Sequence, residues 1–254
     1  MLETLRHDAI VELRLARPPV NALDPQLVRS LREAIDAAAR EARGIVLSGR
    51  PGMFSAGLDV PALLALDRPA LRAFLEDLFA LCGALARSAV PVVAAITGHS
   101  PAGGAVLAIF CDYRVMARSA DPDKPFRIGL NEVQVGLSVP ACIQAGLQRL
   151  LGPYRAERLM VAGRMLDSEQ ARAIGLVDEL AEVDAVVPRA LDWLRGLLAL
   201  PPRAMATTRA LARADLAAVF TDPARLRLDE FTDAWFAAET QASLHALVAR
   251  LKAR

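Results

Sequence analysis

The 254-residue sequence contains little of what cross-linked, metal-binding or membrane-spanning proteins need. Its three cysteines, Cys82, Cys111 and Cys142, stand singly in apolar surroundings and form no CxxC pair. Neither a disulfide framework nor a metal cluster is therefore expected, and we predict that the thiols are reduced and buried. The longest apolar stretch, around residues 89–97, is too short to span a bilayer. No Walker motif and no dinucleotide fingerprint is present.

An excess of charge of one sign is also missing. Lys and Arg number 30 and Asp and Glu number 29, which argues against a broadly basic surface for nucleic acid. The N-terminus carries Glu3, Arg6 and Asp8 before any apolar run. It therefore has neither the hydrophobic region of a signal peptide nor the acid-poor composition of a transit peptide. We expect a cytoplasmic protein with no membrane or nucleic-acid partner.

What the sequence does contain is an alternation of strand and helix patterns. Residues 9–16 alternate apolar and polar side chains, as a half-buried strand does. Asp24 and Pro25 then provide an N-cap and a first-turn proline for a helix that runs to about Arg43. Buried strands are further expected at 45–47, 90–96 and 113–117, and helices at 61–87 and 103–110. This order predicts an α/β domain with parallel strands.

From about Pro140 onward the pattern is almost entirely helical. Residues 223–254 are predicted to form one long amphipathic helix or a pair of helices. The residues expected on their buried face are Leu226, Phe231, Trp235, Leu244, Leu247 and Leu251. Because a helix gains most of its stability from packing such a face, we expect the tail to dock on its own subunit or on a neighbour. The polar segment Ser119–Pro125 is interpreted as a flexible insertion.

Three segments combine glycine with residues able to do chemistry, namely residues 54–59, 96–104 and 129–136. The second segment superficially resembles the nucleophile elbow of a serine hydrolase, with Ser100 as the nucleophile. In such an elbow the residue after the serine supplies a backbone N–H to the oxyanion, but Pro101 has none to supply. A downstream histidine is also needed, and only His245 in the helical tail is available. The hydrolase interpretation is therefore disfavoured.

The glycines themselves indicate another role. Gly103 and Gly104 open a helix directly after a strand, where free backbone N–H groups and the helix dipole favour negative charge. Gly57 and Leu58 can supply a second free N–H from the first segment. Two such donors converging on one oxygen would form an oxyanion hole. The alternative, that each glycine merely permits a tight turn, stays open for each segment taken alone.

Together the motifs resemble those of the crotonase superfamily, the enoyl-CoA hydratase/isomerase family, over nearly the whole chain. The segments that carry the resemblance are Asn21-Ala22-Leu23, 54–59, 98–112 and 129–136. Within the family, Pro101–Gly104, Cys111–Arg114 and Gly129–Glu132 are most similar to the mitochondrial-type Δ3,Δ2-enoyl-CoA isomerases.

The resemblance implies an α/β fold, the crotonase (ClpP-like) spiral of ββα repeats with a helical C-terminal region. Residues 1–200 would form the spiral core, and residues 201–254 a helical region for trimerisation or for covering the site. A homotrimer or a hexamer built as a dimer of trimers is implied. The partner would be an acyl-CoA thioester, and no cofactor is implied beyond the CoA that the substrate carries.

The resemblance also implies roles for individual residues. The backbone N–H groups of Leu58 and Gly103 match the family's oxyanion-hole donors, which stabilise a thioester enolate. Family hydratases use two glutamates, but here Val106 occupies the first position and Glu132 the second. One carboxylate can run a 1,3-proton shift, so the pattern favours isomerisation of 3-enoyl-CoA to trans-2-enoyl-CoA in fatty-acid β-oxidation. The substrate-binding residues implied are Ser55, Ala56, Asp59, Pro101, Gly104, Val106 and Asn131.

Several alternatives remain at this point. The same oxyanion hole would serve enoyl-CoA hydration, acyl-CoA decarboxylation or thioester hydrolysis, and a non-catalytic acyl-CoA-binding protein is a further possibility that the presence of Glu132 disfavours. Asp59 and Asp112 are expected to hold loops by hydrogen bonds rather than to transfer protons. Asn131 either orients a pocket group or shapes its own loop. The segment Ala120–Arg127 looks longer than in the mitochondrial-type relatives, which leaves the preferred acyl chain length open.

Overall fold

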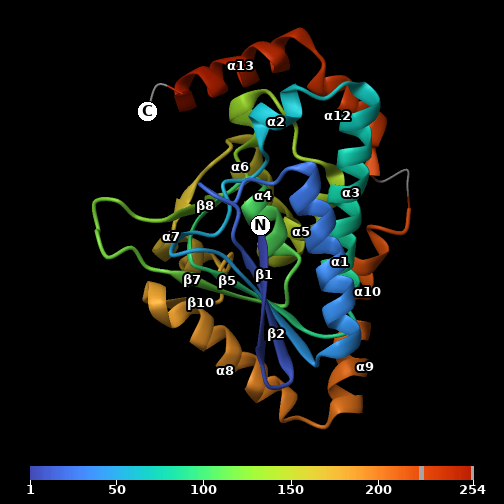
Figure 1. Cartoon of the computed structure of the whole chain (residues 1–254), viewed down its shortest axis with the longest axis vertical. Helices are drawn as coiled ribbons and strands as arrows, with labels where there is room; N and C mark the ends of the chain where they lie inside the picture. Colours follow the sequence, from blue (N-terminus) through green and yellow to red (C-terminus); the bar gives the residue numbers. More distant parts are fainter. Residues whose placement is uncertain (223–225, 253–254) are drawn as a thin grey trace.

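The computed structural model describes residues 1–222 and 226–252 and is centred on two β-sheets (Figure 1). In spatial order, the main sheet contains β1 (Leu2–His7), β2 (Ile10–Leu15), β3 (Gly44–Ser48), β5 (Val92–Ile96), β7 (Tyr113–Ala117) and β10 (Glu179–Ala181). The smaller sheet contains β4 (Gly52–Met53), β6 (Gly98–Pro101), β8 (Arg127–Gly129) and β9 (Leu166–Asp167). The predicted α/β class is confirmed.

The main sheet is mixed, because β1 and β2 form an antiparallel hairpin, whereas β2, β3, β5, β7 and β10 are parallel. The sequence did not predict β1, since Glu3 and Arg6 interrupt any apolar pattern. Both side chains are exposed on this strand at the end of the sheet. Charged side chains on an edge strand discourage pairing with further strands, which explains why a strand here lacks a hydrophobic signature.

Helices cover both faces of the main sheet, and the strands are apolar on both sides for that reason. Ile45 and Leu47 pack into the large core, while Val46 between them packs into a second core on the opposite face, as alternating side chains of a strand must. The helices concerned are α1 (Pro25–Glu41), α3 (Arg68–Arg87) and α4 (Gly103–Ile109) on the first face and α8 (Val186–Leu198) on the second. In Figure 1, α1 and α3 lie side by side, with α8 across the sheet from them.

Three successive stretches of chain repeat one pattern, in which a strand of the main sheet leads into a strand of the smaller sheet and then into a helix. The stretches are β3–β4 followed by α2 (Val60–Leu64) and α3, β5–β6 followed by α4, and β7–β8 followed by the 3₁₀ helix η1 (Glu132–Val135) and α5 (Ala141–Leu151). This is the expected spiral of ββα repeats. The smaller sheet was not predicted, because its strands of two to four residues are too short to show a period.

The rest of the chain is mainly helical. Its elements are α6 (Pro153–Val161), α7 (Ser168–Ile174), η2 (Val183–Ala185), α9 (Pro202–Ala212), α10 (Ala214–Ala218), α12 (Leu228–Trp235) and α13 (Ala238–Lys252). The expectation of an almost entirely helical region after Pro140 missed β9 and β10, again because each is only two or three residues long. The polar segment 119–125 forms a largely exposed loop that projects between β7 and β8 (Figure 1).

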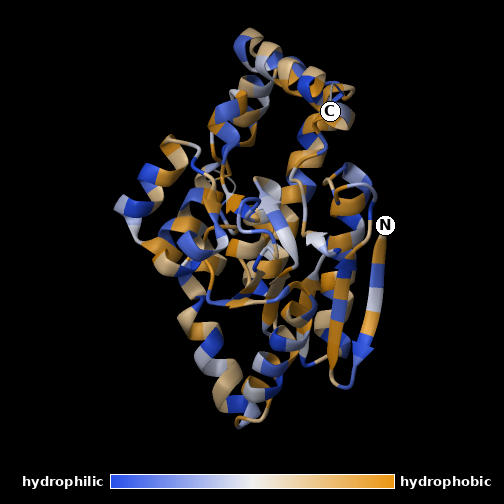
Figure 2. Ribbon diagram, turned by 90° about the vertical axis from the view of Figure 1, so that its left-hand side faces the viewer, coloured by the Kyte–Doolittle hydropathy of each residue, from blue (hydrophilic) through white to orange (hydrophobic). Residues whose placement is uncertain are grey.

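The C-terminal tail forms a pair of helices that dock on their own chain. Pro223, where the tail was expected to begin, lies outside the described residues. α12 packs against α3, and α13 packs against α2 and η1, so that α13 crosses one end of the molecule (Figures 1 and 2). Phe231, Trp235 and Leu244 are buried as predicted, and Leu226 and Leu247 are half-buried. Leu251 is 53% exposed, contrary to prediction, because it lies beyond the part of α13 that packs on the core.

The three cysteines are free and buried. Across the described parts of the chain, no helix has the length and apolarity to cross a membrane.

Candidate active site

The smaller sheet brings the three glycine-bearing segments together. Its strands β4, β6 and β8 are parallel neighbours, so the segments that follow them leave from the same edge. Residues 54–59 follow β4, Ala102 and Gly103 follow β6, and residues 130–136 follow β8. The Ala102 N–H donates to the Gly129 carbonyl at 2.8 Å, which joins the second segment to the third. The segments were expected directly after the main-sheet strands, but the smaller sheet's strands intervene and set their positions.

The first two segments touch through their backbones. A Cβ atom built on Gly57 would lie 3.1 Å from the backbone nitrogen of Gly103, and one built on Gly103 would lie 3.2 Å from the Cα atom of Gly57. Gly57 has φ +86°, a conformation that side chains disfavour. The N–H groups of Leu58 and Gly103 donate no hydrogen bond to the described residues. Two free donors therefore lie on adjacent segments, as an oxyanion hole requires.

The turn into α4 is strained. Ala102 adopts φ 43° and ψ −116° at the N-cap of α4, a conformation that costs an alanine about 1–3 kcal/mol. Gly104 follows in a tight space, since a Cβ there would lie 2.6 Å from the Ser55 carbonyl oxygen and 2.9 Å from the Ser100 hydroxyl oxygen. The glycines thus permit close approach of the two segments and also leave the first N–H of α4 free.

Asn21 holds the first segment in place. It is fully buried with φ 52°, and its Nδ2 donates to the Phe54 carbonyl at 3.0 Å. Its own carbonyl accepts from the Ser55 hydroxyl at 2.8 Å, and that hydroxyl oxygen accepts from the Gly57 N–H at 3.2 Å. The sequence identified Asn21 only as part of a motif. A signal that could have assigned it a role is a lone asparagine in an apolar stretch, since Asn is enriched in left-handed backbone.

Charged groups fix the same segment from outside. Asp59 N-caps α2 by accepting from the Ala62 N–H at 3.1 Å, and it pairs with Arg17 at 2.6 Å. The Arg17 guanidinium also pairs with Asp24 at 3.1 Å. Ala56 is held by its N–H, which donates to the Val20 carbonyl at 2.9 Å. Asp59 thus secures a loop, as expected.

Asp112 has a comparable structural role away from the three segments. It accepts from the Val92 N–H at 2.8 Å and from two nitrogens of Arg209 at 2.7 and 2.8 Å. Arg213 lies 3.3 Å from the same carboxylate. This network attaches α9 and α10 to the core.

Glu132 begins η1, directly after Leu130 and Asn131. Its Oε2 atom is buried and has no hydrogen-bond partner in the described structure, and neither has Asn131 Oδ1. Burial raises the pKa of Glu132 to about 7, because removal from water disfavours the charged carboxylate. It lies three positions after Gly129, so its Cα lies within about 11 Å of the Gly129–Ala102 contact. A carboxyl group with such a pKa is suited to accept and return a proton near neutral pH.

The remaining expected site residues lie on α4 or where the three segments meet. Val106 lies on α4, one turn after Gly103, and is 2% exposed; no carboxylate is present at that position. Pro101 pairs with Gly129 across β6 and β8, and Ser55 and Gly104 are buried between the segments.

The Ser100 hydroxyl is buried without a partner among the described residues, and the His245 ring contacts the Gln241 carbonyl rather than Ser100. The hydrolase interpretation gains no support.

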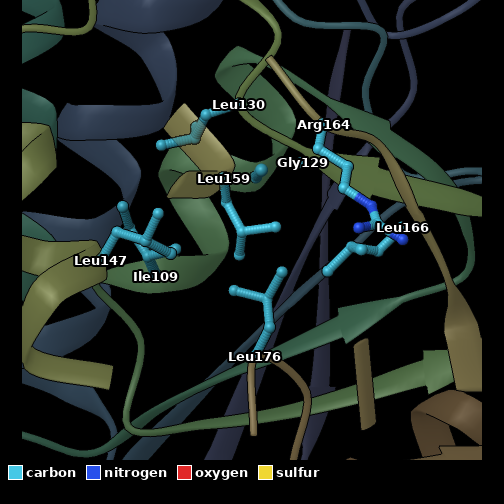
Figure 3. Close-up of a pocket in the computed structure, with 9 residues that line it drawn as sticks. Ile109, Gly129, Leu130, Leu147, Leu159, Arg164, Leu166 and Leu176 are labelled. Atoms are coloured by element: carbon cyan, nitrogen blue, oxygen red, sulfur yellow. The ribbon is translucent and has the colours of Figure 1, made fainter. Parts of the chain in front are cut away.

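A small apolar cavity lies behind the third segment (Figure 3). It has a volume of about 10 Å³, room for about one water. Its lining residues are Ala105, Ile109, Gly129, Leu130, Leu147, Leu159, Arg164, Leu166 and Leu176. The aliphatic side chains of Ile109, Leu159 and Leu176 point toward one another (Figure 3), and the small volume makes this space a packing defect of the core that is too small for an acyl chain.

Comparison with known proteins gives the context of this geometry. Residues 6–254 match the sequence model of the family described as "Enoyl-CoA hydratase/isomerase". "Enoyl-CoA delta isomerase 1, mitochondrial" of Mus musculus is 30% identical over 99% of this chain and 87% of its own. "Probable enoyl-CoA hydratase EchA17" of Mycobacterium tuberculosis is 34% identical over 78% of this chain and 74% of its own. The crystal structure of human mitochondrial delta3-delta2-enoyl-CoA isomerase superposes with a TM-score of 0.91 at 28% identity, covering 99% of this chain and 98% of that one.

The isomerase and hydratase relatives are thus similar to this chain to nearly the same degree. The expected resemblance and the crotonase fold with its C-terminal helices are both confirmed. The chain belongs to the enoyl-CoA hydratase/isomerase family, the crotonase superfamily of acyl-CoA enzymes.

Proposed function

We propose that this enzyme isomerises 3-enoyl-CoA to trans-2-enoyl-CoA, a reaction of β-oxidation of unsaturated fatty acids. The observation that carries the proposal is the combination of the Glu132 carboxyl group, whose Oε2 atom is buried without a partner in the described structure, with Val106 at the position where the family's hydratases have their other glutamate. The two free backbone donors support the same chemistry.

The reaction would proceed as a proton shift between two carbons. The thioester carbonyl oxygen accepts hydrogen bonds from the N–H groups of Leu58 and Gly103, and the Glu132 carboxylate removes a proton from C2. The negative charge that develops spreads onto the carbonyl oxygen, where both donors stabilise it. Glu132 then returns the proton to C4, and the double bond moves from C3–C4 to C2–C3. No water enters the reaction, and the enzyme ends as it began.

Enoyl-CoA hydration is the second candidate, favoured by the similarity to the mycobacterial protein named as a hydratase. Hydration requires a water molecule that is positioned and activated beside the double bond. Two carboxyl groups achieve this well, whereas the Val106 side chain can neither orient water nor transfer a proton. Since overall identity does not separate the two reactions, the assignment rests on these two positions.

The test compares two substrates in three proteins. Isomerisation of a 3-enoyl-CoA and hydration of crotonyl-CoA are measured for the wild type, Glu132→Gln and the control Glu157→Gln, whose glutamate is exposed on the neighbouring α6. We expect fast isomerisation, little hydration, loss of isomerisation by about 10²-fold or more in Glu132→Gln, and an unaffected control. Fast hydration in the wild type, or full isomerase activity in Glu132→Gln, would contradict the proposal.

We further propose that the chain assembles as a homotrimer or as a dimer of trimers, with residues 201–254 serving as the trimerisation and covering region. Tyr154 and Val161 on α6 are 71% and 74% exposed, and apolar side chains so exposed are suited to a subunit contact. Light scattering coupled to size-exclusion chromatography measures the mass directly. A monomer of 27.2 kDa at micromolar concentration would refute this part.

A further inference from the structure

The C-terminal helix α13 contacts both halves of the candidate site. It packs against α2, which begins directly after the Leu58–Asp59 segment, and against η1, which begins with Glu132. Figure 1 shows α13 lying across this end of the molecule, above α2. The helix is therefore placed to influence the geometry of the turn that carries the Glu132 carboxyl group.

One hydrogen bond makes the contact with η1 specific. Thr240 is buried in α13, and its hydroxyl donates to the Gly136 carbonyl at 2.8 Å. Gly136 ends η1 with φ +77°, and its N–H bonds back to the carbonyls of Glu132 and Val133. The Leu137 N–H also donates to the Glu132 carbonyl, at 3.1 Å. Gly136 thus connects Thr240 to the turn that carries the carboxyl group.

Gly136 and α13 are closely packed at this contact. A Cβ atom on Gly136 would lie 3.2 Å from the Cα atom of Thr240 and 3.4 Å from the Ser243 hydroxyl oxygen. The helix backbone therefore lies directly on the end of η1. The 3₁₀ helix η1 also packs against α6, and the Gln134 amide donates to the Gly163 carbonyl at 2.9 Å. The turn is therefore held by contacts with both α13 and α6.

We infer that Thr240 is a positioning residue, which holds the turn of Glu132 in its working geometry through the Gly136 carbonyl. The inference rests on the proposed role of Glu132 as the base that moves the proton. A carboxylate that must reach C2 and then C4 tolerates little displacement, since a shift of about 1 Å in a reacting group can cost about 10²-fold in rate. Substrate affinity should change little, because Thr240 acts on the base and not on the acyl-CoA.

The test compares variants of two neighbouring residues. Thr240→Val removes the hydroxyl and keeps the shape, Thr240→Ser keeps the hydroxyl, and Thr240→Ala removes both. The matched control is Gln241→Met, since Gln241 makes a side-chain hydrogen bond of the same 2.8 Å length, but to the Trp235 carbonyl and away from η1. Two kinds of measurement are made on each full-length protein. Steady-state kinetics give kcat and KM for a 3-enoyl-CoA, and hydrogen exchange is followed at the Gly136 and Leu137 amides.

We expect Thr240→Val and Thr240→Ala to lower kcat by about tenfold or more with KM nearly unchanged, and to speed exchange of both amides. Thr240→Ser and Gln241→Met should resemble the wild type in both measurements. Unchanged amide exchange or unchanged kcat in Thr240→Val would overturn the inference, as would an equal loss in Gln241→Met. If the wild type does not isomerise 3-enoyl-CoA, the proposed function fails, while amide exchange still decides whether Thr240 holds the turn.

Discussion

One added methyl group can test whether the contact between Gly57 and Gly103 positions the two backbone N–H donors. Gly57 has φ +86°, and a Cβ there would lie 3.1 Å from both the Ala102 Cβ and the Gly103 nitrogen. Gly57→Ala therefore has two separable effects. It strains the backbone, and it pushes the Leu58 segment away from the start of α4, which separates the two N–H donors.

The chain provides a control for the first effect alone. Gly175 has φ +85°, but nothing lies within 4 Å of a Cβ built there. Left-handed backbone costs a non-glycine residue about 1–2 kcal/mol, so Gly57→Ala and Gly175→Ala should share that loss of unfolding free energy. Only Gly57→Ala should lower activity, by about 10²-fold or more, since loss of one oxyanion donor costs about 10²–10³ in kcat.

The assay pairs urea unfolding with kcat/KM for the 3-enoyl-CoA, measured well below the unfolding transition so that both variants are fully folded. A Gly57→Ala protein with near wild-type activity would show that the close approach of Gly57 to Gly103 does not set the donor geometry. Equal losses of activity in both variants would attribute the effect to stability.

Three further outcomes follow from named contacts. Burial raises the pKa of Glu132 from 4.5 to about 7, so the stability this group contributes is complete below about pH 4.5 and is lost as the pH rises through 7. Unfolding titrations at pH 5 and 8 should therefore show Glu132→Gln gaining about 1–3 kcal/mol on the wild type. Asn21→Gly keeps the left-handed backbone but leaves the Phe54 carbonyl without its 3.0 Å donor; it should cost about 1–3 kcal/mol in urea unfolding and lower kcat. Arg209→Met removes both hydrogen bonds to the half-buried Asp112 carboxylate but leaves Arg213 3.3 Å from it; it should destabilise by about 1–3 kcal/mol while leaving kcat unchanged.

Local signals in the sequence were sufficient for the longer elements. Asp24 was expected to cap a helix, and its side chain does accept from the Leu27 N–H at 2.8 Å. The buried strands predicted at 45–47 and 90–96 were equally visible and correspond to β3 and β5, because both faces of a covered parallel sheet are hydrophobic. The smaller sheet was not visible, since the two residues of β4 form no period. Its position depends on pairing with β6, which lies far along the chain.

In the candidate site, too, the sequence identified some residues and missed the contacts that support them. Gly57, Gly103 and Glu132 stand in recognisable motifs, so the sequence could name them. The supporting contacts could not be named, because they join residues far apart in the chain: Asn21 to Phe54 across 33 positions and Thr240 to Gly136 across 104. The raised pKa of Glu132 was equally inaccessible, since burial results from the packing of all surrounding elements.

Main-chain and side-chain groups have separate roles in the proposed site, which explains why overall similarity does not specify the reaction. In the proposed mechanism, the main-chain N–H groups of Leu58 and Gly103 stabilise the enolate, and their positions depend on backbone geometry that the whole fold maintains. In the same proposal, proton transfer depends on side chains: Glu132 would supply it, while Val106 occupies the other position. A fold can therefore be retained at 30% identity by isomerases and at 34% by proteins named as hydratases, because one or two side chains decide what happens to the enolate. It follows that the reaction of such a chain has to be argued from those side chains and from the contacts that hold them.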